Sequence, residues 1–127
     1  MTSHLLVVEL PDAQVLRALS PNGRAHWAVR RQARQNLQER VQAAVAAAGW
    51  PRCGAGRVRV QATYRFPVRR QRDPDNLTAL LKAVLDALVR LRVLRGDTTR
   101  HCVLLPVAVD DARGPAQLTL VLEEEEA

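Results

Sequence analysis

The run from Leu77 to Leu91 constrains the fold most, because its apolar side chains can be buried together on only one face. Apolar residues recur there at spacings of three and four, which is typical of a helix with one wide apolar stripe. The stripe consists of Leu77, Leu80, Leu81, Val84, Leu85, Leu88 and Leu91. A short helix is marginal in water by itself, so other segments must cover this stripe.

Strand-like segments before and after this helix can supply the covering surface. Residues from Arg57 to Phe66 alternate between polar and apolar side chains, which predicts a half-buried strand. The Leu- and Val-rich run from His4 to Leu10 predicts a buried strand. Two further strands are expected at Cys102 to Val109, where Pro106 marks an edge or a bulge, and at Gln117 to Leu122.

A second, longer helix is expected from about His26 to Ala48, with Gly49 and Pro51 ending it. The segment from Ala13 to Leu19 fits either a short helical turn or an extended connection. Residues 110–115 are rich in Asp, Gly and Pro, which is typical of a hairpin-like loop.

The order of elements is therefore strand, helix, strand, helix, strand, strand. It predicts one small α/β (α+β) domain, a mixed β-sheet of about four strands with two main helices packed on it. The 127 residues, 47% of them hydrophobic, are enough for one core. We expect the domain to span residues 1–122 and the acidic residues 123–127 to form a frayed, solvated tail.

The charge balance points to a polyanionic partner. The net charge is +6, and the four glutamates at 123–126 contribute −4, so the rest of the chain carries +10. A genome rich in Arg codons would explain Arg in place of Lys, but it would not explain the excess of base over acid.

The cysteines and the hydropathy pattern bear on location. Cys53 and Cys102 lack the CxxC or Cys/His spacing of zinc sites, which argues against zinc. Two cysteines without a signal peptide suggest a reducing cytoplasm. No apolar run is long enough to span a bilayer, so no membrane association is expected.

The chemistry-bearing residues flank and line the amphipathic helix. Three arginines precede two carboxylates two residues apart, in the order Arg69, Arg70, Arg72, Asp73 and Asp75. A further carboxylate, Asp97, follows the helix. Basic groups beside clustered acids suit a site that holds metal ions and handles phosphates.

The same helix carries the chain's one lysine, Lys82. At about 100° per residue, Asp75, Lys82 and Asp86 fall within roughly 20° of one another. Asp75 is also placed where an N-cap belongs. Simpler explanations remain open, namely a turn and cap at Asp75, a solvated Lys82–Asp86 pair and a C-terminal turn at Asp97.

Three segments together resemble the RusA family of Holliday-junction resolvases: Arg72 to Leu77, Leu81 to Leu88 and Val93 to Asp97. They are similar to the family's Asp-x-Asp-Asn motif, its Lys-x-x-x-Asp-Ala-Leu helix and the acidic pair that follows. Ser20 to Arg24 resembles the family's Pro/Asn-rich segment. Gly96 stands where the family has the first acid of its pair, and the interval from Asn to Lys is three residues longer than in some members.

The resemblance implies a small α/β homodimer that cuts four-way (Holliday) DNA junctions by paired symmetric nicks, as a crossover junction endodeoxyribonuclease in recombination and repair. Asp73, Asp75 and Asp97 would hold Mg²⁺ or Mn²⁺, which activates a water. Lys82 would stabilise the phosphate in the transition state, with Asp86 and Asn76 in support. DNA phosphates are expected to contact a larger basic set, which consists of Arg24, Arg30, Arg31, Arg34, Arg69, Arg70 and Arg72.

Two alternatives stay open. The chain could be a DNA-binding module without catalysis, in which the acids are caps and turns. It could also be a metal-dependent nuclease for other branched or single-stranded DNA, using the same carboxylates.

Overall fold

Two central strands, β2 (Val58–Arg65) and β5 (Gln117–Glu124), organise the sheet. The computed structural model describes residues 2–19, 26–54, 56–68, 74–96 and 98–125. In these ranges the sheet order is β1–β5–β2–β3, with β4 also paired to β2. The other strands are β1 (Ser3–Glu9), β3 (Cys102–Leu104) and β4 (Ala108–Val109). The sheet is mixed, because β1–β5 and β5–β2 are antiparallel whereas β2–β3 and β2–β4 are parallel.

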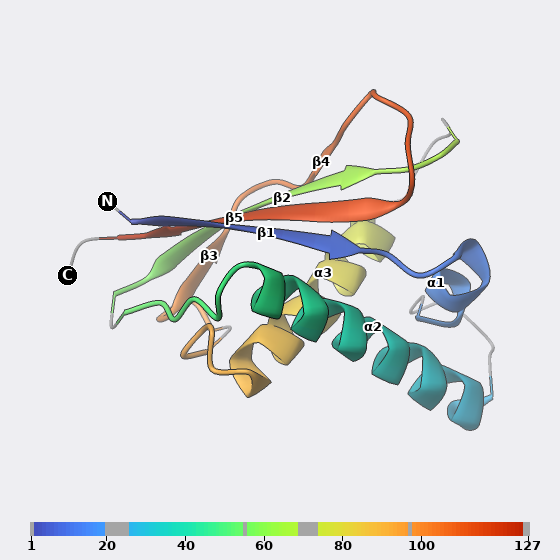
Figure 1. Cartoon of the computed structure of the whole chain (residues 1–127), viewed down its shortest axis with the longest axis horizontal. Coiled ribbons are helices and arrows are strands. Elements are labelled where there is room, and N and C mark those ends of the chain that lie inside the picture. Colours follow the sequence, from blue (N-terminus) through green and yellow to red (C-terminus); the bar gives the residue numbers. More distant parts are fainter. Residues whose placement is uncertain (1, 20–25, 55, 69–73, 97, 126–127) are drawn as a thin grey trace.

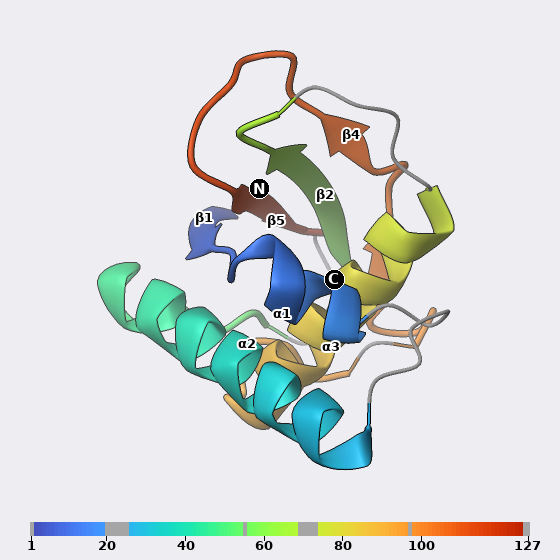
Figure 2. The ribbon, with the colours of Figure 1, turned by 90° about the vertical axis from the view of Figure 1, so that its right-hand side faces the viewer.

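The helices lie on one face of the sheet, which confirms the predicted small α+β domain (Figure 1). They are α1 (Ala13–Leu19), α2 (Trp27–Ala47) and α3 (Pro74–Arg90). The ambiguous segment before residue 20 is thus helical. Figure 2 shows α1 beside α2, and α2 also contacts α3 and β1. α2 begins after His26, whose Nδ1 accepts a hydrogen bond from the N–H of Ala28 at 3.2 Å.

The core lies between the helices and the inward rows of the strands. From the sheet, the buried side chains are Leu6, Val8, Val58, Val60, Ala62, Tyr64, Cys102, Leu118, Leu120 and Leu122. α3 contributes Leu77, Leu80, Leu81, Val84, Leu85, Ala87 and Leu88. The predicted apolar stripe is therefore confirmed, since six of its seven residues are buried and Leu91 packs against the core.

Strand β1 is not the fully buried strand that its composition predicted. It forms an edge of the sheet, paired only with β5 among the described residues. Leu6 and Val8 are buried, whereas Leu5 is 59% and Val7 41% exposed. The prediction was wrong because a Leu- and Val-rich run does not distinguish a central strand from an edge strand.

The expected acidic tail is also corrected. β5 continues to Glu124, so Glu123 and Glu124 belong to the sheet. Arg57 forms an ion pair with Glu125 at 3.1 Å, and the N–H of Glu125 donates to the carbonyl of Arg57. Backbone pairing with β1 and β2 therefore orders glutamates that composition alone suggested would be frayed.

The predicted strand from Cys102 to Val109 is split at Pro106 into β3 and β4 on the sheet edge. Residues 110–115 do not form a hairpin, because β4 and β5 lie on opposite sides of β2. The N–H of Ala112 donates to Asp110 Oδ1 at 2.9 Å, which is ordinary turn chemistry.

α2 has the length to cross a bilayer but carries charged side chains along it. None of the helices described here is apolar enough over sufficient length to span a membrane.

Candidate functional site

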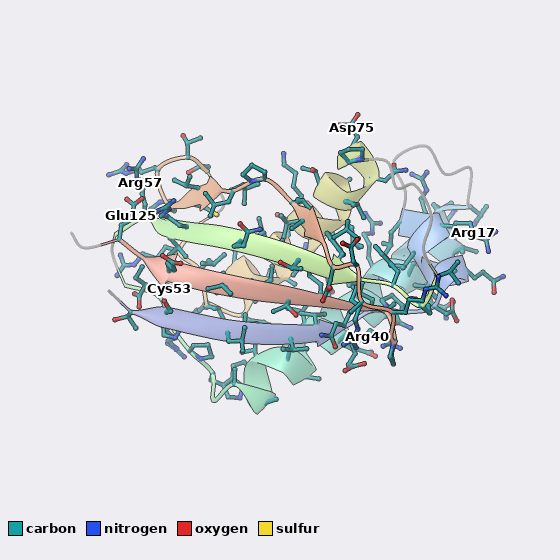
Figure 3. The ribbon with its side chains drawn as sticks, turned by 90° about the horizontal axis from the view of Figure 1, so that it is seen from above. Arg17, Arg40, Cys53, Arg57, Asp75 and Glu125 are labelled. Carbon is teal, nitrogen blue, oxygen red and sulfur yellow. The ribbon has the colours of Figure 1, made fainter. Side chains whose placement is uncertain are left out.

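Helix α3 presents one exposed polar edge, and Asp75 stands at its beginning (Figure 3). The helix starts at Pro74, so Asp75 lies within its first turn. The prediction that Asp75 occupies the N-cap position was therefore wrong. Proline is favoured at the first helical position because its missing N–H has no helical partner there. The carboxylate of Asp75 is exposed and still lies near the positive end of the helix dipole.

A buried hydrogen bond anchors this end of α3 to the sheet. The Tyr64 hydroxyl donates to the carbonyl oxygen of Leu77 at 2.7 Å, and the Tyr64 side chain is fully buried. Its ring is stacked on Phe66 with the centroids 5.8 Å apart. Burial raises the pKa of Tyr64 well above its ordinary value, so the hydroxyl remains a donor. The first turn that carries Asp75 and Asn76 is thus fixed to β2.

Lys82 and Asp86 continue the exposed edge, and Asn76 is half-buried beside Asp75. Lys82 follows Asp75 by seven positions of helix, which is about 10 Å along the axis. The two groups can therefore contact one extended ligand, such as a phosphodiester backbone, but they do not share a single atom-sized site. Lys82 and Asp86 are one turn apart.

The described neighbours of Asp97 lie at the other end of α3. Gly96 approaches the His101 ring, and the carbonyl of His101 accepts from the N–H of Val58, at the start of β2. Tyr64, which anchors the first turn of α3, is six residues further along β2, or about 20 Å. Gly96 and His101 therefore lie near the beginning of β2, away from Asp75.

Gly96 has little room for the acid that the family carries at this position. A Cβ built on Gly96 would come within 2.8 Å of His101 Cδ2. Among the described residues, His101 Nδ1 is buried without a hydrogen-bond partner. An acidic side chain at residue 96 would need His101 to move.

Several predicted site residues lie outside the described part of the chain. These are Arg24, Arg69, Arg70, Arg72, Asp73 and Asp97. Of the predicted DNA-contacting residues on α2, Arg31 and Arg34 are exposed and Arg30 is half-buried.

Other arginines serve the fold. Arg40 donates to Asn36 at 2.8 Å and to the carbonyls of Glu9 and Leu10, which holds α2 to the end of β1. Arg65 donates to the carbonyl of Pro115 and to Gln117. Part of the basic excess is therefore used within the protein itself.

A second group of metal-ligating side chains lies far from Asp75, and the sequence analysis missed it. His4, Cys53 and Glu124 place one donor atom each within 4.8 Å of one another. They come from β1, from the loop after α2 and from the end of β5. No local spacing signals such a group, because only the strand pairing brings these three residues together.

No protein-family model matches this chain, and a search of curated proteins finds no match. The resemblance to the RusA family therefore rests on the motifs in residues 72–97 and on the order of elements.

Proposed function

We propose that this protein is a metal-dependent endodeoxyribonuclease of the RusA kind that resolves four-way DNA junctions. One observation carries the proposal: an anchored, buried helix presents Asp75, Lys82 and Asp86 along one exposed edge. A rigid support of this type is what a phosphate-handling site needs, because the catalytic groups must keep their positions when substrate binds.

The donor set suits a hard cation. Asp75 offers carboxylate oxygens, with Asp73 two residues before it, and Mg²⁺ or Mn²⁺ prefers such ligands. A bound cation of this kind would activate water and offset charge on the leaving oxygen. Lys82, exposed and two turns further along α3, would neutralise charge on the phosphate.

The proposed partners are branched DNA and a second copy of the chain. Exposed Arg31 and Arg34 would contact the phosphate backbone. The apolar stripe of α3 is buried in the core and is not available for a dimer contact. The edge strand β1, with Leu5 and Val7 exposed, is therefore a better candidate for the dimer surface than α3. Two free buried cysteines fit a cytoplasmic protein.

The test is cleavage of a synthetic four-way junction beside a linear duplex of the same sequence, with and without Mg²⁺. We expect paired symmetric nicks in the junction only, dependent on metal and lost in Asp75→Asn. The matched control is Asp111→Asn, which removes an exposed carboxylate from the loop after β4. Turnover that survives Asp75→Asn would refute the catalytic assignment. Equal cutting of both substrates would keep the nuclease and remove the junction specificity.

A DNA-binding module without catalysis is the second candidate, and the position of residues 96 and 98 favours it. If the flanks of Asp97 stay near the start of β2, the acidic trio is not assembled within one subunit. Tight junction binding without nicks under Mg²⁺ or Mn²⁺ would establish this alternative. Asp97→Asn separates the cases further, since a trio predicts the same loss of cleavage as Asp75→Asn.

A further inference from the structure

We propose that His4, Cys53 and Glu124 form a zinc site that ties both ends of the chain to the loop after α2. The proposal is independent of the proposed nuclease, because Cys53 lies at the end of the sheet away from Asp75 (Figure 3). Imidazole nitrogen, thiolate sulfur and carboxylate oxygen are all established zinc ligands, and sulfur disfavours Mg²⁺ or Ca²⁺.

The fold places the three donors on one side of the sheet. Along β1, His4 belongs to the inward row that continues with Leu6 and Val8. Along β5, Glu124 belongs to the row of Leu120 and Leu122. His4 and Glu124 therefore lie at the edge of the core, at the ends of these inward rows. Their side chains are 21% and 20% exposed, respectively.

Backbone contacts bring the third donor to the same rim. The N–H of Cys53 donates to the carbonyl of Val93 at 2.9 Å, and the adjacent N–H of Gly54 donates to Glu124 Oε1. The Cys53 side chain is buried. Glu124 and Cys53 are therefore held by the loop backbone before any ion binds.

The distances are close to those of a zinc complex. In tetrahedral zinc, neighbouring N, O and S ligands are about 3.3 to 3.6 Å apart, from the metal–ligand bond lengths. His4 Nε2 and Glu124 Oε2 are already 3.0 Å apart, and the widest separation in the set is no more than 4.8 Å. The proposal requires a rotation of the Cys53 or His4 side chain to close the difference, and a water molecule as the fourth ligand.

The backbone of the Cys53 loop also orients the carboxylate of Glu124. The carboxylate of Glu124 has enough lone pairs to accept from Gly54 through Oε1 and to bind zinc through Oε2. The hydrogen bonds from the Gly54 N–H and from His4 lower the pKa of Glu124 below its ordinary value. Burial raises the pKa of Cys53 to about 11. Zinc binding would form the S–Zn and Nε2–Zn bonds as the Cys53 thiol proton leaves to solvent and the His4 proton that now faces Glu124 leaves Nε2, with Nδ1 carrying the proton of the neutral ring.

The ion would stabilise the folded domain by linking β1, β5 and the loop after α2. Its ligands are distant in sequence, since Cys53 follows His4 by 49 positions and Glu124 follows Cys53 by 71 positions. An ion that binds only the folded state raises its stability through mass action, by an amount that grows with the free zinc concentration. We therefore expect zinc to raise the melting temperature of the whole domain.

The experiment uses the full chain without a histidine tag, stripped of metal and titrated with Co²⁺. A thiolate-to-cobalt charge-transfer band with tetrahedral visible bands is expected, saturating at one equivalent and abolished by Zn²⁺. The acidic edge of α3 would bind Co²⁺ only through oxygen and gives no thiolate band. Failure of the nuclease proposal would leave this band intact, and failure of the band would leave Mg²⁺-dependent cleavage intact.

Matched variants locate the site. Cys53→Ser should remove the charge-transfer band, and Glu124→Gln should weaken Co²⁺ binding about tenfold or more, or about 1.4 kcal/mol. The controls are Cys102→Ser, which removes the other buried thiol, and Glu123→Gln, on the opposite face of β5; both should keep the band. If Cys53→Ser does not fold, the partly exposed Glu124→Gln and His4→Gln variants decide. A missing band in the wild type, or a band that follows Cys102, overturns the proposal.

Discussion

Tyr64→Phe tests the anchoring of α3, because it removes one hydroxyl and leaves the ring on Phe66. The lost interaction is the 2.7 Å hydrogen bond to the Leu77 carbonyl. Leu77 lies within the helix, so its carbonyl keeps its helical acceptor role and is not left unpaired. The expected cost is therefore the net value of one buried hydrogen bond, about 1 kcal/mol, rather than the larger penalty of an orphaned group.

The assay is urea unfolding of both proteins at neutral pH. The midpoint should fall with an unchanged slope, and the melting temperature should fall by about 4 °C for a domain of this size. A loss of less than about 0.3 kcal/mol would show that the hydroxyl does not anchor the helix. A loss well above about 3 kcal/mol would show that the ring itself shifts.

The same variant has an expected pH dependence. The pKa of Tyr64 is raised in the folded protein, so the folded state holds its proton more tightly than the unfolded chain does. Stability from this group is fully present below about pH 10, the ordinary tyrosine value, and is lost as the pH rises above it. Tyr64→Phe should remove this alkaline loss, so the stability gap between the two proteins should narrow above pH 10. A constant gap would contradict the assignment.

Three further changes probe the core, the proposed catalytic edge of α3 and the proposed dimer surface on β1. Leu81→Ala, at a fully buried position, should cost about 2 to 5 kcal/mol in urea unfolding; a loss below 1 kcal/mol would contradict its place in the core. Lys82→Ala should reduce junction cleavage by about tenfold or more and leave the melting temperature unchanged. Arg90→Ala on the same helix should change neither the cleavage rate nor the melting temperature. Val7→Lys on the edge of β1 should give a monomer by sedimentation, whereas Val109→Lys on β4, at the other edge, should leave the mass unchanged.

The sequence predicted most elements because their signals are local. The apolar stripe of α3 and the alternation in β2 each depend on side chains a few residues apart, and the structure bears both out. Element order then limits the architecture to helices packed on a mixed sheet. Pro106 was predicted to mark an edge or a bulge, and it lies in the break between β3 and β4 beside β2, since proline cannot donate to a sheet ladder.

Pairings between distant segments could not be predicted in this way. The edge position of β1 depends on its pairing with β5 at the far end of the chain. Glu124 has a fixed position because its backbone pairs with β1 and β2 and its side chain accepts a hydrogen bond from the N–H of Gly54. For the same reason the sequence did not predict a metal site at His4 and Cys53, because the residues next to each of them form no metal-binding motif.

Chain direction also decides how much of the acidic motif can act as one site. α3 runs back along β2, since Tyr64, near the end of the strand, contacts Leu77 in the first turn of the helix. The segment after α3 then pairs with Val58, at the beginning of β2. Asp75 and the flanks of Asp97 are therefore separated by roughly the length of that strand. The spacing of 22 residues in sequence conceals this separation, and Asp97→Asn, compared with Asp75→Asn, tests whether the proposed acidic residues act as one site.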